Sequence, residues 1–313
     1  MNNFVTESDN KRYFTQNRYL RSIFGEKVIK LSLNAGMSCP NRDGTRGHGG
    51  CIYCSPVLSG DFSGNISSSI TEQMKQQTEL LSAKWKSSVY IAYFQAGTNT
   101  YAPLSELIPL YEEALSFPGT AGITIATRAD CISDEMLEYL KKLSEKTFLT
   151  VELGLQTIHD NTAGLINRCH SFEEFKGTYS RLMSAGIKTC IHIINGLPGE
   201  TREMMMQTAE EVSRLRPQSI KIHMLHIIKG TLLESMYKEN PFHLLTKDEY
   251  INIVCNQIEI MHPDIVIERL TGDGDKSTLE APLWTCDKRS VLNGIDKELK
   301  HRDTWQGKKI KGL

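Results

Sequence analysis

The sequence has no long apolar run and no large excess of charge of either sign. No segment approaches the roughly 20 consecutive apolar residues that a membrane-spanning helix needs, so we expect no contact with a membrane. The formal net charge of −1 excludes the overall basic field that is typical of many nucleic-acid-binding proteins. The first residues lack the basic-then-apolar order of a signal peptide, and we therefore expect the protein to be cytoplasmic.

Cysteine pairs are also scarce, because the 8 cysteines include a single C-x2-C pair. In a reducing compartment, cysteines serve metal binding or redox chemistry more often than disulfides. Five cysteines are scattered, and we expect most of them to be small buried apolar residues: Cys131, Cys169, Cys190, Cys255 and Cys286. One cysteine-rich loop therefore remains as a candidate metal site.

That loop contains Cys39, Cys51 and Cys54, spaced as C-x11-C-x2-C among several glycines. Three thiolates can hold a soft metal centre. They are one ligand short of a closed tetrahedral structural site, which leaves an open position for chemistry. The cysteines alone leave two kinds of site open, an iron–sulfur cluster or a zinc ion whose coordination His48 or a distant cysteine completes.

Apolar, β-branched segments alternate with helical patterns through most of the chain. Strands this apolar are typical of a parallel sheet that is buried on both faces. We predict strands at residues 28–33, 89–94, 122–126, 148–153, 187–194 and 219–225, and helices at 69–85, 103–115, 133–143, 172–185 and 201–215. A further helix is expected at 247–262 and a short strand at 264–269. This order predicts an α/β fold, an incomplete (β/α)6 TIM-like barrel with a short C-terminal extension.

The predicted organisation has three parts. Residues 1–25 form an N-terminal extension, residues 26–245 the partial barrel, and residues 246–313 a C-terminal extension that closes the barrel mouth and ends in a basic tail. Chemistry in such barrels gathers at the C-terminal ends of the strands. The unusual residues of this chain, including the cysteine loop, follow the predicted strands.

Six motifs occur along the chain in the same order as in a known family. They are Cys39-Pro40-Asn41-Arg42-Asp43-Gly44, Gly50-Cys51-x-x-Cys54, Glu152-Leu153-Gly154-Leu155-Gln156-Thr157, Asn167-Arg168-Cys169-His170, residues 193–200 and Glu268-Arg269-Leu270-Thr271-Gly272-Asp273. With these motifs the chain resembles the radical S-adenosylmethionine (SAM) superfamily, in particular a YhcC/YtqA-like family related to the radical SAM domain of the Elongator catalytic subunit. The usual spacing in the superfamily is C-x3-C-x2-C, and the longer gap here is compatible with the Elongator branch.

The resemblance implies a barrel of the radical SAM type and two cofactors, a 4Fe–4S cluster and SAM. Cys39, Cys51 and Cys54 would ligate the cluster, and the open iron would bind the amino and carboxylate groups of SAM. Cleavage of SAM to a 5′-deoxyadenosyl radical would take one electron from an external reductant of the flavodoxin or ferredoxin type. The residues that the resemblance places at SAM are Tyr53, Gly97, Thr98, Glu152, Gln156, Arg168, Asn195, Met224 and Leu225.

Side-chain chemistry agrees with several of these assignments. The guanidinium of Arg168 matches a carboxylate as a two-pronged donor. Glu152 and Gln156 alternate with leucines, so their side chains share one face of a strand end. For Tyr53 and Leu225, packing in the core is an alternative to a contact with SAM.

The substrate is less defined by the sequence. The branch resemblance implies tRNA, with modification of a nucleobase, whereas a small molecule or a peptide is the alternative for an enzyme. A metal-stabilised nucleic-acid-binding protein without catalysis is the alternative from another class. The residues expected to contact a substrate are Arg42, Arg46, His48, Arg269 and Asp273, and no catalytic residue is assigned beyond the cluster and SAM.

Overall fold

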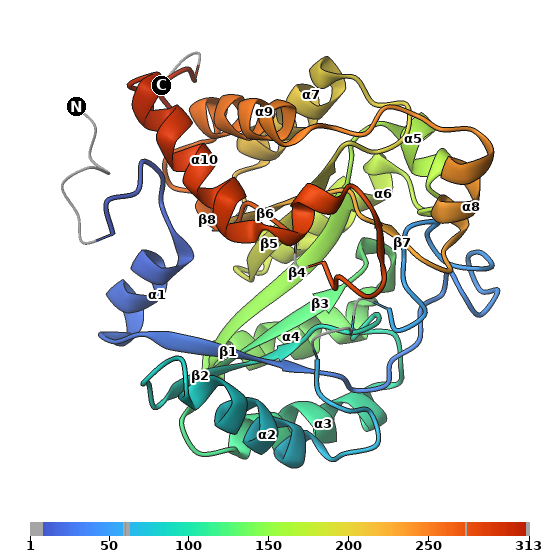
Figure 1. Ribbon diagram of the computed structural model, residues 1–313. Helices are drawn as coiled ribbons and strands as arrows, with labels where there is room; N and C mark the ends of the chain where they lie inside the picture. The colour runs from blue at the N-terminus through green and yellow to red at the C-terminus, as the bar shows by residue number, and fades with distance from the viewer. Residues whose placement is uncertain (1–8, 59, 61–62, 273, 311–313) are drawn as a thin grey trace.

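Seven parallel strands form one curved sheet in the computed structural model, which describes residues 9–58, 60, 63–272 and 274–310 (Figure 1). The strand order is β1-β2-β3-β4-β5-β6-β8. The strands are β1 (Val28–Leu33), β2 (Val89–Phe94), β3 (Thr120–Thr127), β4 (Phe148–Gln156), β5 (Lys188–Asn195), β6 (Ser219–Met224) and β8 (Val266–Arg269). The predicted partial barrel is confirmed, and the short strand predicted at 264–269 extends it by one strand, because β8 pairs in parallel with β6.

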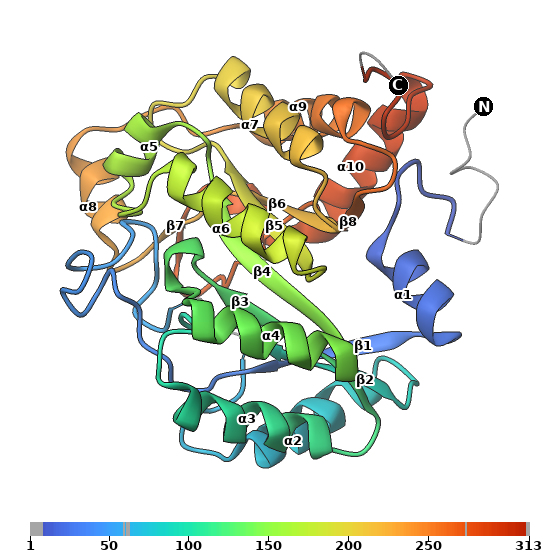
Figure 2. The same cartoon turned by 180° about the vertical axis from the view of Figure 1, so that it is seen from behind.

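Helices cover the outer face of the sheet (Figure 2). Their N-termini follow the predicted capping: Ser133 accepts a hydrogen bond from the backbone of Met136 at 3.1 Å, and Thr201 accepts one from Met204. The helices after β1 to β6 are α2 (Ile70–Ser82), α3 (Leu104–Ser116), α4 (Asp134–Lys146), α5 (Asp160–Leu165), α6 (Phe172–Ser184), α7 (Arg202–Leu215), α8 (Leu232–Glu239) and α9 (Lys247–Ile260). Among the described residues, no helix combines the length and the apolar content that crossing a bilayer requires.

Helix α1 (Gln16–Phe24), which the sequence patterns did not predict, packs against β1 and β8, the two edge strands of the sheet (Figure 1). The backbone N–H of Ile267 in β8 donates to the carbonyl of Phe14 at 2.8 Å. The segment before α1 therefore binds one edge of the half-barrel, and α1 bridges toward the other.

The C-terminal extension packs on the β6–β8 side of the sheet. Helix α10 (Lys288–His301) lies on α9, and α9 lies on α7 (Figure 1). The extension also contributes the short strand β9 (Leu279–Ala281), which pairs antiparallel with β7 (Ile227–Ile228). Part of the basic tail is engaged in this packing, because the ammonium group of Lys309 lies 2.6 Å from the carboxylate of Glu259.

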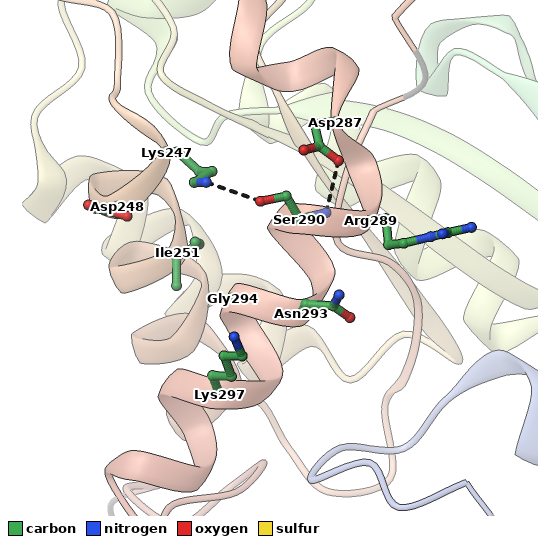
Figure 3. A pocket seen from close by; sticks show the side chains of 9 residues that line it. All are labelled: Lys247, Asp248, Ile251, Asp287, Arg289, Ser290, Asn293, Gly294 and Lys297. Carbon is green, nitrogen blue, oxygen red and sulfur yellow. Dashed lines mark hydrogen bonds between the residues drawn. The ribbon is translucent and has the colours of Figure 1, made fainter.

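A surface hollow of about 460 Å³ lies between α9 and α10 (Figure 3). The ammonium group of Lys247 donates to the hydroxyl of Ser290 at 3.0 Å across it. Lysine and arginine alternate there with Asp248 and Asp287, so the hollow has no uniform charge. It is lined by the two helices and not by the ends of the barrel strands.

Gln306 should anchor the C-terminal segment to the barrel. Its buried amide donates to the carbonyls of His262 and Ile265 at 2.7 and 2.8 Å and accepts from the backbone of Phe14 at 2.8 Å. We expect Gln306→Ala to lower the free energy of unfolding by about 1–3 kcal/mol, since buried backbone groups lose their partners. Urea denaturation measures this change, with Gln76→Ala on the exposed side of α2 as the control. Equal stabilities of the two variants would contradict the anchoring role.

Candidate functional site

A cavity of about 400 Å³ opens at the carboxyl ends of the parallel strands. Residues from all parts of the predicted site line it. Those that the sequence predicted are Cys39, Cys51, Tyr53, Cys54, Gly97, Thr98, Glu152, Gln156, Arg168, Met224, Leu225 and Arg269. The fold therefore brings the three cysteines and most of the expected SAM residues to one cavity, although their roles stay predictions.

The cysteine loop has a hairpin inserted between the first two cysteines. The N–H of Gly50 donates to the carbonyl of Asn41 at 2.7 Å, and Asp43 pairs antiparallel with His48. These bonds close off residues 42–49 as a side loop. If those residues are omitted, the remaining Cys39-Pro40-Asn41-Gly50-Cys51-Ile52-Tyr53-Cys54 has the spacing C-x3-C-x2-C. The hairpin therefore brings residues 41 and 50 next to each other, so that the path from Cys39 to Cys51 corresponds to the shorter spacing.

Glycine is required where the hairpin folds back on itself. A Cβ atom on Gly47 would lie 2.4 Å from Oδ1 of Asn41 and 2.6 Å from the sulfur of Cys169. A Cβ atom on Gly50, whose φ is +80°, would lie 2.9 Å from Nε of Arg42. A side chain at either position would force its neighbours, Asn41 and Cys169 or Arg42, to shift.

The three cysteines are thiols without disulfide partners. Burial raises the pKa of Cys51, against the opposing effects of Arg128 and of hydrogen bonds from Tyr53 and Asn41. Burial and the neighbouring Cys51 raise the pKa of Cys54 to about 11. Because thiolates bind metals, a soft cation that displaces these protons would relieve the cost of charging the buried sulfurs.

The end of β2 approaches the cysteine loop closely. Gly97 has a φ of +76°, and a Cβ atom there would lie 2.1 Å from the carbonyl oxygen of Met37. The N–H of Thr98 donates to the carbonyl of Ser38 at 3.1 Å. Glycine is needed at position 97 for this packing, whether or not it also contacts a ligand.

The end of β4 presents polar side chains to the cavity, as the alternation predicted. Glu152, Gly154 and Gln156 line the cavity, whereas Leu153 and Leu155 are buried in the core. A register shift between Gly154 and Gln156 accompanies a φ of +61° at Gln156. This left-handed residue marks the point where β4 leaves the sheet.

Glu152 is the centre of a buried charge network that joins six strands. One of its oxygens lies 2.6 Å from the ammonium of Lys221, 2.7 Å from the hydroxyl of Tyr93 and 2.9 Å from Nε2 of His192. The ammonium of Lys30 lies 3.2 Å from the other oxygen and 2.8 Å from Glu268 on β8. Burial alone would raise the pKa of Glu152, but the lysines and His192 outweigh it and hold that pKa well below its usual value.

The sequence patterns did not predict these partners of Glu152. Each of these partners is a polar residue inside a mostly apolar strand, namely Lys30, Tyr93, His192 and Lys221. A signal was present, since an isolated lysine in a buried strand needs an opposite charge. The sequence could not say which carboxylate supplies that charge, because the strands are far apart along the chain.

Glu152, Cys190 and His192 have ligand atoms within 4.8 Å of one another, a geometry that a metal ion could use. However, the carboxylate of Glu152 already contacts the ammonium groups of Lys30 and Lys221. Two positive charges at this distance disfavour a cation, and the prediction of one metal centre at the cysteine loop stands.

Arg168 lies on the cavity wall with its donors already occupied. Its guanidinium donates to the carbonyl of Thr157 at 2.6 Å, to that of Leu155, and to that of His170 at 2.9 Å and 3.0 Å. These bonds hold the loop after α5 against the end of β4. Its expected role at the SAM carboxylate would require it to exchange these partners, and stays a prediction.

Cys169 follows Arg168 where the related motif has glycine. Its φ of +62° lies in the left-handed region, so the loop keeps the conformation that glycine favours. Next to it, burial and Arg168 lower the pKa of His170 to about 4, which keeps the ring neutral. His170 lies on the cavity wall although the sequence analysis did not select it.

Several expected contacts lie away from the cavity wall. Asn195 exchanges two hydrogen bonds with Gln257 at 2.8 and 2.9 Å and is buried beside it. Arg42 donates to the carbonyls of Cys54 and Pro56 at 3.3 and 2.9 Å, which holds the cysteine loop. The remaining positions are Arg46, which pairs with Asp130 and Glu174, His48, whose carbonyl accepts from Asn167, and Asp273, which lies outside the described residues.

The chain matches two known sequence families. Residues 42–212 match the radical SAM superfamily, and residues 217–301 match the radical SAM C-terminal domain. The first match covers more than half of the chain and includes Cys51 and Cys54. The second includes β8 and α10.

Two curated relatives differ in how much of each protein is shared. The chain is 47% identical to the uncharacterised protein YtqA of Bacillus subtilis over 98% of this chain and 95% of that protein. It is 29% identical to a tRNA uridine(34) acetyltransferase of Methanocaldococcus infernus over 52% of this chain, and it spans 31% of that protein.

A solved structure supports the fold. The Elp3 protein of the archaeon Methanocaldococcus infernus, with an N-terminal deletion, superposes with a TM-score of 0.67 at 19% sequence identity. The match covers 89% of this chain and 64% of that one. At this identity the likeness establishes the shared half-barrel and nothing about activity.

Glu152→Gln should destabilise the protein at neutral pH and flatten its acid sensitivity. A carboxyl whose pKa is depressed in the folded state contributes stability above its unfolded pKa and loses it as the pH falls through the folded pKa. We expect a loss of about 3 kcal/mol near pH 7, because the buried ammonium group of Lys221 loses its carboxylate, whereas Lys30 keeps Glu268. Denaturant unfolding from neutral pH to below about pH 4 measures both effects. Glu145→Gln on the exposed face of α4 is the control. If the stability of Glu152→Gln fell at acid pH as much as that of the wild type, the network would be contradicted.

Proposed function

The chain belongs to the radical SAM superfamily, within its YtqA/YhcC-like family, and we propose that it holds a 4Fe–4S cluster and SAM in the cavity at the strand ends. Cys39, Cys51 and Cys54 would be the cluster ligands. When bound, the cluster and SAM together supply a 5′-deoxyadenosyl radical that abstracts hydrogen from a substrate, after an external donor of the flavodoxin or ferredoxin type has delivered one electron.

The donor set fits this cofactor. Three thiols from one loop line a single cavity, and soft sulfur ligands are those that iron–sulfur clusters use. The single observation that carries the proposal is the closed hairpin at residues 42–49, since it gives the long gap the C-x3-C-x2-C arrangement in space. A zinc site completed by His48 is less favoured, because His48 is not on the cavity wall and takes part in the hairpin's own pairing.

The same cavity offers contacts to the rest of SAM. Gly97 and Thr98 present backbone close to the cysteine loop, where the ammonium end would lie. Gln156 offers an amide suited to ribose hydroxyls, and Met224 and Leu225 offer an apolar surface suited to adenine. Tyr53, between the last two cysteines, would border the adenine. These residues orient SAM and exclude water from it.

Glu152 would act on the cofactor indirectly. Its charge is neutralised by Lys30, Lys221 and their neighbours, so it is less available to an incoming ammonium group than the sequence implied. The network instead keeps the polar wall of the cavity in one arrangement. Pre-organisation of this kind reduces the reorganisation that binding would otherwise require.

We propose that the substrate is a tRNA nucleobase. Support comes from the sequence relative named a tRNA uridine(34) acetyltransferase, with which the chain shares 170 aligned residues. The cavity wall also carries four cationic side chains, those of Arg128, Arg168, Lys221 and Arg269, of which Arg128 pairs with Asp130 and Lys221 with Glu152. Groups rich in hydrogen-bond acceptors, such as nucleobase carbonyls and phosphates, suit such a wall.

Arg269 is the substrate contact that we retain from the sequence motif at residues 268–273. It lines the cavity together with Gly272, on the side formed by β8. Arg42 and Arg46 are less suited to this role, since their recorded partners are the cysteine loop and the carboxylates of Asp130 and Glu174.

Single replacement of Cys39, Cys51 or Cys54 by alanine should abolish cluster binding. We expect the wild-type protein, reconstituted with iron and sulfide without oxygen, to show the visible absorbance of a thiolate-bound cluster and about four irons per chain. Each variant should lose most of both, because a ligand is missing. Cys286→Ala, in a different part of the chain, is the matched control.

A colourless wild-type protein with one bound zinc would contradict the cluster. In that case the three cysteines would form the zinc site that the sequence alone also allowed, and SAM chemistry would have no electron source.

Deletion of the gene should remove or reduce one modified nucleoside in total tRNA. Mass spectrometry of digested tRNA from cells with and without the gene measures this loss. A gene copy that encodes Cys51→Ala should fail to restore the nucleoside, whereas the copy with Cys286→Ala should restore it.

An unchanged nucleoside profile would overturn the tRNA proposal. It would leave the cluster and SAM proposal in place and favour a small molecule or a peptide as the substrate.

A further inference from the structure

The side chain of Asn41 lies next to the sulfur of Cys51, at the base of the hairpin. Its side chain is buried, with 0% of the residue exposed. The amide nitrogen Nδ2 lies 3.6 Å from the sulfur of Cys51 and also donates to the carbonyl of Asn167. A side-chain amide carries two N–H groups, so each of these acceptors receives one.

The surroundings fix which end of the amide faces the sulfur. Both neighbours of Nδ2 are acceptors, whereas Oδ1 is buried and has no hydrogen-bond partner among the described residues. The reverse orientation would place Oδ1 against the carbonyl oxygen of Asn167 and leave the sulfur without this donor. The N–H therefore points at Cys51.

Contacts with Gly50, Asn167 and Gly47 fix the position of Asn41. Its carbonyl accepts from Gly50 at 2.7 Å, and the carbonyl of Gly50 accepts from the amide of Asn167 at 2.8 Å. Gly47 leaves the space that Oδ1 of Asn41 occupies. These contacts come from the protein itself and hold the amide donor next to the sulfur of Cys51.

We propose that Asn41 is a positioning residue for the cluster and raises its reduction potential through an N–H···S hydrogen bond to Cys51. This inference rests on the proposed function. A donor to a ligand sulfur stabilises the extra negative charge of the reduced cluster more than that of the oxidised one. Arg42, the next residue, faces a different cysteine: its guanidinium donates to the carbonyls of residues 54–56, and its charge and hydrogen bond oppose the rise in the pKa of Cys54.

The test is the midpoint potential of the reconstituted cluster in the wild-type protein and three variants, measured by redox titration with electron paramagnetic resonance (EPR) detection. We expect Asn41→Ala to shift the potential to a more negative value. Asn41→Gln, which keeps an amide donor, should bring the potential part of the way back to the wild-type value. Thr45→Ala, which removes the hydrogen bond from Tyr101 at the tip of the same hairpin, should match the wild type.

Iron-loaded Asn41→Ala with the wild-type potential would overturn the inference. A second measurement covers the case in which this variant loses its cluster. In wild-type protein with asparagine labelled at the side-chain amide nitrogen, pulsed EPR of the reduced cluster should detect a weakly coupled nitrogen, and its absence would also overturn the inference. If the wild-type protein binds no cluster, the proposed function itself fails, which distinguishes the two cases.

Discussion

The buried carboxylate of Glu152 is the constraint that the barrel interior depends on. An isolated carboxylate without partners would be strongly disfavoured in this environment, and here it is met by Lys30, Tyr93, His192 and Lys221 from four other strands. Lys30 also reaches Glu268, which links the edge strand β1 to the opposite edge strand β8. Hydrogen bonds between neighbouring strands cannot make this connection in an open sheet. The charge network therefore ties the two edges of the half-barrel across its interior and fixes the polar wall of the cavity.

The rim of the cavity, formed by the cysteine loop at residues 39–54, depends on a hairpin that brings cysteines distant in sequence together. The bond from Gly50 to Asn41 makes the loop short in space although it is long in sequence. Glycines at positions 47 and 50 and the amides of Asn41 and Asn167 hold the hairpin against the segment after α5. A metal centre placed there would meet ligands that are already held near one another, with a donor already directed at one sulfur. The rim and the wall meet at Gly97, where a positive φ brings the end of β2 close to the cysteine loop.

Much of the architecture follows from local patterns, and the discrepancies have physical causes. Apolar runs located six strands, and serine and threonine caps located the starts of α4 and α7, because these signals need no knowledge of the rest of the chain. Helices α1, α5, α8 and α10 were not predicted. The first three have only 9, 6 and 8 residues, which is too short for a periodic apolar pattern to stand out. The strand at β8 was predicted, but its place in the sheet was not, because four residues pair with β6 only after α8 and α9 have folded back. Among the site residues, Asn195 and Arg42 carry plausible ligand chemistry, yet each has protein partners that no sequence pattern indicates.

The sequence by itself determined the kind of chemistry and the general fold. Three cysteines in a glycine-rich loop predict a soft-metal site, the alternation of apolar strands and helices defines a partial barrel, and the motifs along the chain indicate the superfamily. The tertiary structure decided which polar groups are already paired and which remain on the cavity wall. It also showed that residues 42–49 form a closed hairpin and that the amide of Asn41 faces a cysteine sulfur. These facts depend on contacts between segments that are remote along the chain, and such contacts are set by the packing of the whole barrel and not by local sequence.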